Sequence, residues 1–288
     1  MPKVILMPAT GTDADSAVFA TGLGAARLFD AHLVALHVRP DIRREIASLA
    51  AADMGMTAGL DATMTRMEQE AAAREIAAAK SWREFCQANA ITGAESPGPA
   101  GVTGEWQSET GVEADWLAEY GRAADLIVAG RQREMGIVAM DVLEAALMDT
   151  GKAVLIAPEV APAPLDRIVA IAWKDTREAA KAVTAALPFV RKAARVLVFT
   201  VQESPDDDAD KSALRVARAL RWHNGEVEVR ALQKGDTAVT TLLTAADDAK
   251  ASMLVMGGYG HTRLREAVFG GFTRAVLERA PIPVLMAH

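Results

Sequence analysis

The sequence predicts an α/β protein made of two tandem, doubly wound domains, each built on a five-stranded parallel sheet. Apolar strand-like runs alternate with alanine-rich helical stretches, the two halves of the 288-residue chain carry matching runs, and a proline-rich stretch separates them. Parallel strands that helices cover on both faces are typically near-continuous apolar runs. A chain of this length has room for two domains of about 140 residues each.

The matching runs locate the boundary between the domains. They are residues 3–8, 125–130 and 153–158 in the first half, and residues 167–172, 252–257 and 283–288 in the second. Between the halves, residues 158–164 contain three prolines, which lack amide donors and suit a linker better than a sheet. We therefore expect a first domain at residues 1–160 and a second at residues 165–288.

In the second half, five strands alternate with four helices. The strands are expected at residues 167–172, 195–201, 226–232, 252–257 and 282–287, and the helices at 177–190, 209–222, 237–248 and 272–279. Sheets of this kind bind ligands beyond the carboxyl ends of the strands, where the strand order reverses. The loop after the fourth strand is therefore the expected site.

The first half follows the same order but is about 37 residues longer before its fourth strand. The extra length is mostly helical and includes Met54, Met56, Met64 and Met67. An amphipathic helix bearing methionines is more often core or subunit contact, and the alternative is a lid or a partner groove. The last strands of the halves, residues 154–156 and 284–286, could pair across a pseudo-twofold axis and cover each other's edge.

Composition narrows the class of partner. A formal net charge of −7 disfavours nucleic acid and anionic membranes as partners, and no segment approaches the roughly 18 apolar residues of a membrane span. Cys86 is the single cysteine, so the chain forms no internal disulfide, and no histidine pair has metal-ligand spacing. The first residues lack a signal-peptide pattern. We expect a cytoplasmic protein without a metal cluster.

Glycines cluster after the fourth strand of the second half, at Gly257, Gly260, Gly270 and Gly271, followed by Thr273 and a helix. Glycine lets backbone amides approach an anion without a Cβ in the way. The first amides of the following helix have no internal partners, and the helix dipole favours a bound phosphate. The hydroxyl of Thr273 adds a further donor. This loop is therefore a candidate phosphate cradle.

The spacing Gly257-x2-Gly260-x9-Gly270, set between an apolar strand and a short helix, resembles the ATP-binding signature of the universal stress protein family. The resemblance extends over both halves. It implies a tandem member whose two adenine nucleotide α-hydrolase-like domains form an intramolecular pseudo-dimer, with a further homodimer as an alternative. It also implies ATP or AMP as the ligand, with Gly257, Gly260, Gly270 and Thr273 on the phosphates and ribose and Val201 on the base.

Two residues depart from the family pattern. Gly271 stands where the family has Ser or Thr, and one missing hydroxyl contact weakens binding roughly two- to thirteenfold. Lys174 stands where the resemblance puts the carboxylate that ends strand one. Asp175, one residue later, either substitutes for that carboxylate or caps the helix that begins near Arg177.

His261 and Arg263 lie one and three residues after Gly260. They either neutralise phosphate charge or are solvated loop residues.

The first half has lost more of the pattern. Aligned backward from the last strand, the residues that face Gly270, Gly271 and Thr273 are Met140, Asp141 and Leu143. An aspartate beside a phosphate repels it, and leucine offers no donor. We therefore expect the first half to bind no nucleotide.

These patterns favour a stress-response regulatory protein that holds an adenine nucleotide in its second domain. No general base is recognisable, so slow ATP hydrolysis is the most that we expect. The alternatives are a scaffold that acts through protein contacts and an adenylate-processing enzyme.

Overall fold

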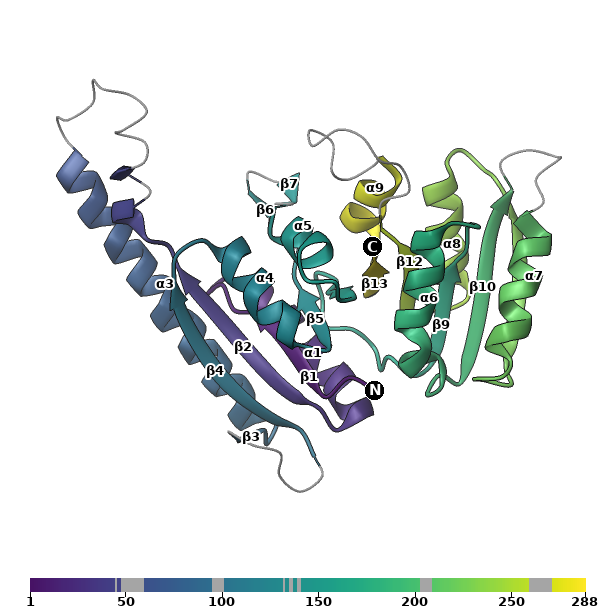
Figure 1. Cartoon of the computed structure of the whole chain (residues 1–288), viewed down its shortest axis with the longest axis horizontal. Coiled ribbons are helices and arrows are strands. Elements are labelled where there is room, and N and C mark those ends of the chain that lie inside the picture. The colour runs from purple at the N-terminus through teal and green to yellow at the C-terminus, as the bar shows by residue number, and fades with distance from the viewer. Residues whose placement is uncertain are drawn as a thin grey trace.

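The fold centres on one eleven-stranded sheet with a separate two-stranded hairpin, β6–β7, beside it. Figure 1 shows the computed structural model, which describes residues 1–44, 46–47, 60–94, 101–131, 133–134, 137–138, 141–202, 209–258 and 271–288. All structural statements below concern these residues.

The elements of the first half are β1 (Val4–Pro8), α1 (Ala14–Phe29), β2 (His32–Arg39), α3 (Leu60–Ala88), β3 (Thr92–Gly93), β4 (Thr103–Thr110), α4 (Glu113–Ala123), β5 (Leu126–Ala129), β6 (Arg133–Glu134), β7 (Ile137–Val138), α5 (Asp141–Met148) and β8 (Val154–Ile156). Those of the second half are β9 (Ile168–Ala172), α6 (Arg177–Val190), β10 (Arg195–Gln202), α7 (Ala209–Leu220), β11 (Val227–Gln233), α8 (Ala238–Asp248), β12 (Met253–Gly257), α9 (Gly271–Arg279) and β13 (Val284–Ala287).

The strand order repeats between the halves. It runs β11-β10-β9-β12-β13 through the second half and continues β8-β5-β1-β2-β4-β3 through the first. Each half thus holds five parallel strands in the order third, second, first, fourth, fifth, and the first half adds the short strand β3 at the outer edge. The predicted doubly wound α/β class is confirmed.

The two halves share the sheet through their last strands. β13 pairs antiparallel with β8, with Leu285 opposite Leu155, and these side chains are fully buried. The expected pairing of residues 284–286 with 154–156 is confirmed. Because each strand covers the other's edge, neither half exposes its fifth strand.

Two apolar cores lie on opposite faces of the sheet. Helices α1, α3, α6 and α7 contribute to one core and α4, α5, α8 and α9 to the other. The first core crosses the join, since Phe29 of α1 and Phe189 of α6 pack edge to face with ring centroids 5.0 Å apart. Burial on both faces explains why the inner strands are almost continuously apolar.

The extra segment of the first half contains α3, which runs along the outside of the sheet (Figure 1). Its residues Ala71, Ala78 and Trp82 are buried, and Trp82 packs edge to face on Phe19 of α1 at 5.2 Å. Met64 and Met67 are half-buried, whereas Met54 and Met56 lie outside the described residues. The helix therefore contributes to the core, as the first interpretation expected. Within the described ranges, no helix has the length and apolar character needed to cross a bilayer.

Candidate functional site

The glycine-rich segment of the second half begins at the carboxyl end of β12. Gly257 ends the strand, and the Gly258 amide donates to the Ala287 carbonyl at 2.9 Å. Gly260, His261, Arg263 and Gly270 of the predicted cradle lie outside the described residues. The description resumes at Gly271, the first residue of α9.

Gly257 has a packing role that the sequence did not reveal. A Cβ at this position would lie 2.6 Å from the amide nitrogen of Ala179 and 2.7 Å from the carbonyl carbon of Glu178, both in α6. Only glycine allows the helix to approach the strand end so closely. In the first half, a Cβ at Gly130 would meet Val18 of α1 at 2.9 Å. Packing therefore explains why both halves keep this glycine.

Gly271 and Thr273 lie in the first turn of α9. Gly271 is exposed, and a Cβ there would meet no atom within 4 Å, so packing does not require this glycine. Thr273 is only 6% exposed. The first amides of a helix lack partners within the helix, so those of the first turn of α9 need acceptors from outside it.

The first half begins the matching helix at the aligned residue. α5 starts at Asp141 and α9 at Gly271, and the same alignment sets buried Leu143 opposite Thr273. The first residue of α9 is a glycine without a side chain, whereas the first residue of α5 carries a carboxylate. The contrast predicted from the sequence therefore lies at equivalent structural positions.

Val201 and Asp175 lie at the carboxyl ends of β10 and β9. The last pair between these strands joins Phe199 to Ala172, so Val201 extends past the end of β9 while still pairing with Leu232 of β11. In a strand, residues two apart direct their N–H and C=O groups to the same side. The Phe199 carbonyl accepts from the Trp173 amide, just beyond the end of β9. The N–H and C=O of Val201 therefore also point to the β9 side.

Asp175 does not cap α6, so the capping interpretation is wrong. The cap is Thr176, whose hydroxyl accepts from the Ala179 amide at 3.2 Å. Because α6 starts at Arg177, the residue directly before it takes the extended cap conformation. Asp175 is exposed and pairs with Arg215 of α7 at 3.2 Å.

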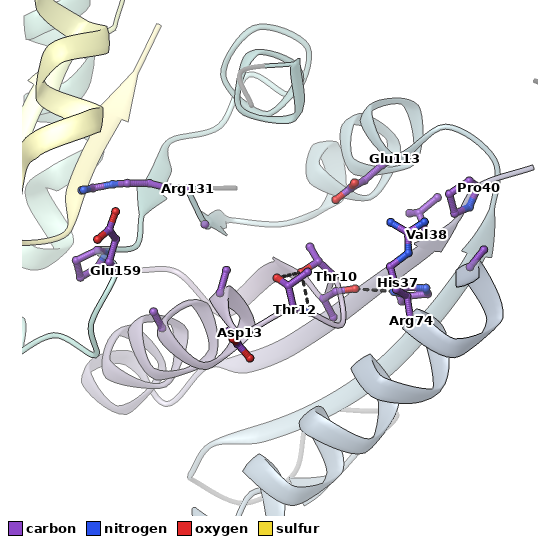
Figure 2. Close-up of a pocket in the computed structure, with 16 residues that line it drawn as sticks. Thr10, Thr12, Asp13, His37, Val38, Pro40, Arg74, Glu113, Arg131 and Glu159 are labelled. Carbon is purple, nitrogen blue, oxygen red and sulfur yellow. Dashed lines mark hydrogen bonds between the residues drawn. The ribbon is translucent and has the colours of Figure 1, made fainter. Parts of the chain in front are cut away.

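A cavity of about 600 Å³ lies in the first half, which sequence reasoning did not anticipate. It opens at the carboxyl ends of β1, β2 and β5 and is bounded by α1, α3 and α4 (Figure 2). Its lining includes Thr10, Thr12, Asp13, His37, Arg74, Glu113, Arg131 and Glu159. The position matches the carboxyl edge at which such sheets bind ligands.

The buried carboxylate of Asp15 holds the β1–α1 loop, which lines the cavity, through hydrogen bonds. It accepts hydrogen bonds from the Thr10 amide at 2.9 Å, the Thr10 hydroxyl at 2.8 Å and the Gly11 amide at 2.8 Å. Gly11 has a φ of +75°, and a Cβ there would collide with the Arg74 carbonyl. This loop therefore takes a fixed shape with α3 packed directly against it.

Arg131 joins the cavity to the second half. It is 8% exposed, and its Nη1 donates to the Ala280 carbonyl at 2.6 Å just beyond the end of α9, with Ile282 as a second, longer acceptor. A cation there also complements the negative end of the helix dipole. In Figure 2 its side chain extends away from the rest of the cavity toward the second half.

Arg131→Ala is expected to lower the free energy of unfolding by about 2 kcal/mol, because buried carbonyls lose a charged donor. Urea denaturation measures this. Arg122→Ala is the matched control, since exposed Arg122 also donates to a carbonyl, that of Asp149, at 3.2 Å. A change below about 0.5 kcal/mol is expected there. Equal losses in the two variants would contradict a buried bridge at Arg131.

Metal ligation has no support among the residues that are described. Nowhere in those ranges do three or more His, Cys, Asp or Glu side chains gather as a metal site would need.

Comparison with known proteins agrees with this fold. Residues 159–288 match the model of the universal stress protein family. A universal stress protein from Archaeoglobus fulgidus DSM 4304 superposes with a TM-score of 0.69 at 19% identity, covering 99% of this chain and 95% of that chain. A Pseudomonas aeruginosa UCBPP-PA14 protein assigned as a universal stress protein superposes with a TM-score of 0.58 at 16% identity, covering 99% of this chain and 93% of that one.

A universal stress protein solved in complex with cAMP is 22% identical over 42% of this chain and 97% of its own, with a TM-score of 0.34. The search of curated proteins gives no match. The full-length likenesses show the fold of the whole chain, and the family match covers the second half. Residues 159–288 thus match the universal stress protein family, and the first half of the chain has the same fold.

Proposed function

We propose that the protein is a stress-response regulator that binds ATP or a related adenine nucleotide at the carboxyl edge of its second half. The observation that carries the proposal is the contrast between Gly271 and Asp141, the first residues of the matching helices α9 and α5. Gly271 leaves the helix amides open to an anion, whereas the Asp141 carboxylate repels one. The family match of the second half supports the same site.

The phosphates would lie between the end of β12 and the start of α9. Gly258 and Gly271 border the segment that carries Gly260 and Gly270, with His261 and Arg263 between them in sequence. The Gly271 position costs the ligand a hydroxyl contact that the family usually supplies, but it opens space beside the backbone. We expect weak binding with backbone amides as the main donors.

The base would lie against Val201. Its backbone groups extend past β9 and are directed to the side where β9 ends, which suits hydrogen bonds to a planar base edge. Asp175 would reach the base only after its ion pair with Arg215 is broken. Surface ion pairs of this kind contribute about 1 kcal/mol at most. The base contact therefore rests on main-chain groups.

Calorimetric titration of ligand-free protein with ATP tests the proposal. The wild-type protein is expected to bind, and Gly271→Asp, which copies the first-half residue, is expected to bind about tenfold or more weakly because of charge repulsion. Asp141→Gly in the first half is the control and should leave the affinity unchanged. Equal affinity of wild-type and Gly271→Asp proteins would refute the site, and negligible heat in both would favour a scaffold that acts through protein contacts.

A further inference from the structure

The second half ends in a long strand that is paired on one side. β11 (Val227–Gln233) is the last strand at this end of the sheet, and β10 is its only neighbour among the strands that the structure describes. β11 has seven residues, whereas the terminal strand at the opposite end, β3, has two. An unpaired strand side presents a row of amides and carbonyls that can pair with another chain.

Alternate residues of β11 direct their main-chain groups away from β10. The Glu226 carbonyl accepts from the Val196 amide of β10 at 2.8 Å. The Val227 carbonyl instead accepts from the Arg221 guanidinium at 3.1 Å, so it faces outward and is already occupied. Residues two apart in a strand share a side. The residues after Val227 that face outward are therefore Val229, Ala231 and Gln233.

The flank of α7 beside this strand edge carries an exposed leucine. α7 lies at the outer end of the second half (Figure 1). One flank faces the inner strands, because Ser212 accepts from the Trp173 indole beyond β9 at 3.0 Å. Arg221, on the opposite flank, reaches the outer side of β11. Leu214 shares the flank of Arg221, because seven residues make almost two helical turns. Its side chain is 55% exposed.

Leu214 lies level with the middle of the outward-facing run. α7 connects the parallel strands β10 and β11, so it runs in the opposite direction to them. The seven residues from Arg221 back to Leu214 rise about 10 Å, which corresponds to about three residues of strand. Counted from Val227, this height falls at Arg230 and Ala231. Ala231 is exposed and small, so it leaves room beside the leucine.

A second copy of β11 fits this edge in one antiparallel register. With a twofold axis at Ala231, the three outward-facing residues pair only with one another: Val229 with Gln233 of the second copy, and Ala231 with its own counterpart. An axis at Val229 would need the Val227 carbonyl, which Arg221 occupies. An axis at Arg230 would set two arginines directly opposite each other, which is destabilising. The axis at Ala231 sets Arg230 opposite Leu232 instead.

We propose that two copies of this chain form a dimer by antiparallel pairing of β11 around a twofold axis at Ala231. The sheet then continues from one copy into the other, and both α7 helices lie on the same face. Their Leu214 side chains meet beside the axis and cover the join. The contact lies at the side of the sheet, so it is independent of nucleotide binding at the carboxyl edge.

Analytical ultracentrifugation of the whole chain over a dilution series tests the proposal. We expect a monomer–dimer equilibrium. Leu214→Lys should raise the dissociation constant at least about tenfold, because two ammonium groups would face each other near the axis. Ile76→Lys is the matched control, since Ile76 is 70% exposed on α3 of the first half, and it should leave the constant unchanged. A protein that stays monomeric throughout, or equal losses in the two lysine variants, would overturn the proposal.

Ala231→Pro tests the main-chain pairing itself. The Ala231 amide faces outward, so proline removes only the hydrogen bond to the second copy, and a strand edge tolerates proline on that side. Each copy loses one hydrogen bond, so the dissociation constant should rise roughly five- to a hundredfold. An unchanged dissociation constant would show that β11 does not form the contact.

Amide hydrogen exchange measured by NMR gives a readout at single residues. In the wild-type dimer, the Ala231 and Gln233 amides should exchange slowly, as should the Leu232 amide, which faces β10. In Leu214→Lys, exchange at Ala231 and Gln233 should become faster, while Leu232 stays protected. A dimer in which the Ala231 amide exchanges as fast as in the lysine variant would pair through another surface and would contradict the register.

Discussion

Asp15→Ala is expected to lower the free energy of unfolding by about 3 kcal/mol, the largest loss that we predict for a single side chain at the edge of the first half. The carboxylate is 1% exposed and accepts three hydrogen bonds, two of them from the amides of Thr10 and Gly11. Hydrogen bonds to a charged acceptor are stronger than neutral ones, and alanine leaves all three donors without it.

Urea denaturation with an unchanged m-value measures this loss. Asp15→Asn keeps one acceptor oxygen and should lose only part of the stability, about 2 kcal/mol. Asp13→Ala is the surface control: Asp13 is exposed, and its side chain makes no capping hydrogen bond to α1, so little change is expected. A loss in Asp13→Ala as large as that in Asp15→Ala would contradict the network.

Gly257→Ala is expected to destabilise the protein by about 2 kcal/mol, because the new methyl group would overlap backbone atoms of α6 that cannot rotate away. The 2.6 Å approach to the Ala179 nitrogen requires either the strand end or the helix to move. That movement would also reach the glycine segment that follows β12. We therefore expect this variant to lose nucleotide affinity together with stability.

Gly271→Ala separates the packing role from the binding role. A Cβ at Gly271 meets nothing within 4 Å, so alanine should leave stability unchanged or raise it by up to about 1 kcal/mol through its helix propensity. The denaturation midpoints of Gly257→Ala and Gly271→Ala, each compared with the wild-type protein, test this difference. Equal destabilisation of both would mean that the α6 contact does not distinguish Gly257.

The second half could be predicted closely because its inner strands are buried on both faces. α6 has the predicted bounds of residues 177–190, and β13 starts two residues later than residue 282, beyond Pro283. Pairing of β8 with β13 also followed from the sequence, because two short apolar strands each needed a covered edge.

Other features lay beyond sequence reasoning. β4 was not identified, because its sequence TGEWQSET is polar and the strand is largely half-exposed near the outer edge of the sheet. The cavity forms because α3 packs beside the sheet. The position of that helix could not be predicted from a local pattern in the long first-half segment. Arg131 acts on a carbonyl 149 residues away. A contact between residues so far apart in the chain produces no recognisable spacing pattern in a single sequence.

The two halves thus share a fold and differ in the chemistry of one edge. At equivalent positions, the second half opens a helix with Gly271 and the first with Asp141. The first half instead has a cavity of about 600 Å³ at its own carboxyl edge. We therefore expect the two edges to differ in their affinity for a nucleotide.

Glycine-selective ¹⁵N NMR with ATP tests this asymmetry most directly, since glycine amides mark both edges and Gly→Ala variants assign them. The account predicts that ATP shifts the amide signals of Gly257, Gly258 and Gly271 and leaves those of Gly11 and Gly130 in place. Shifts confined to Gly11 and Gly130, or no shift at Gly271 at saturating ATP, would contradict it.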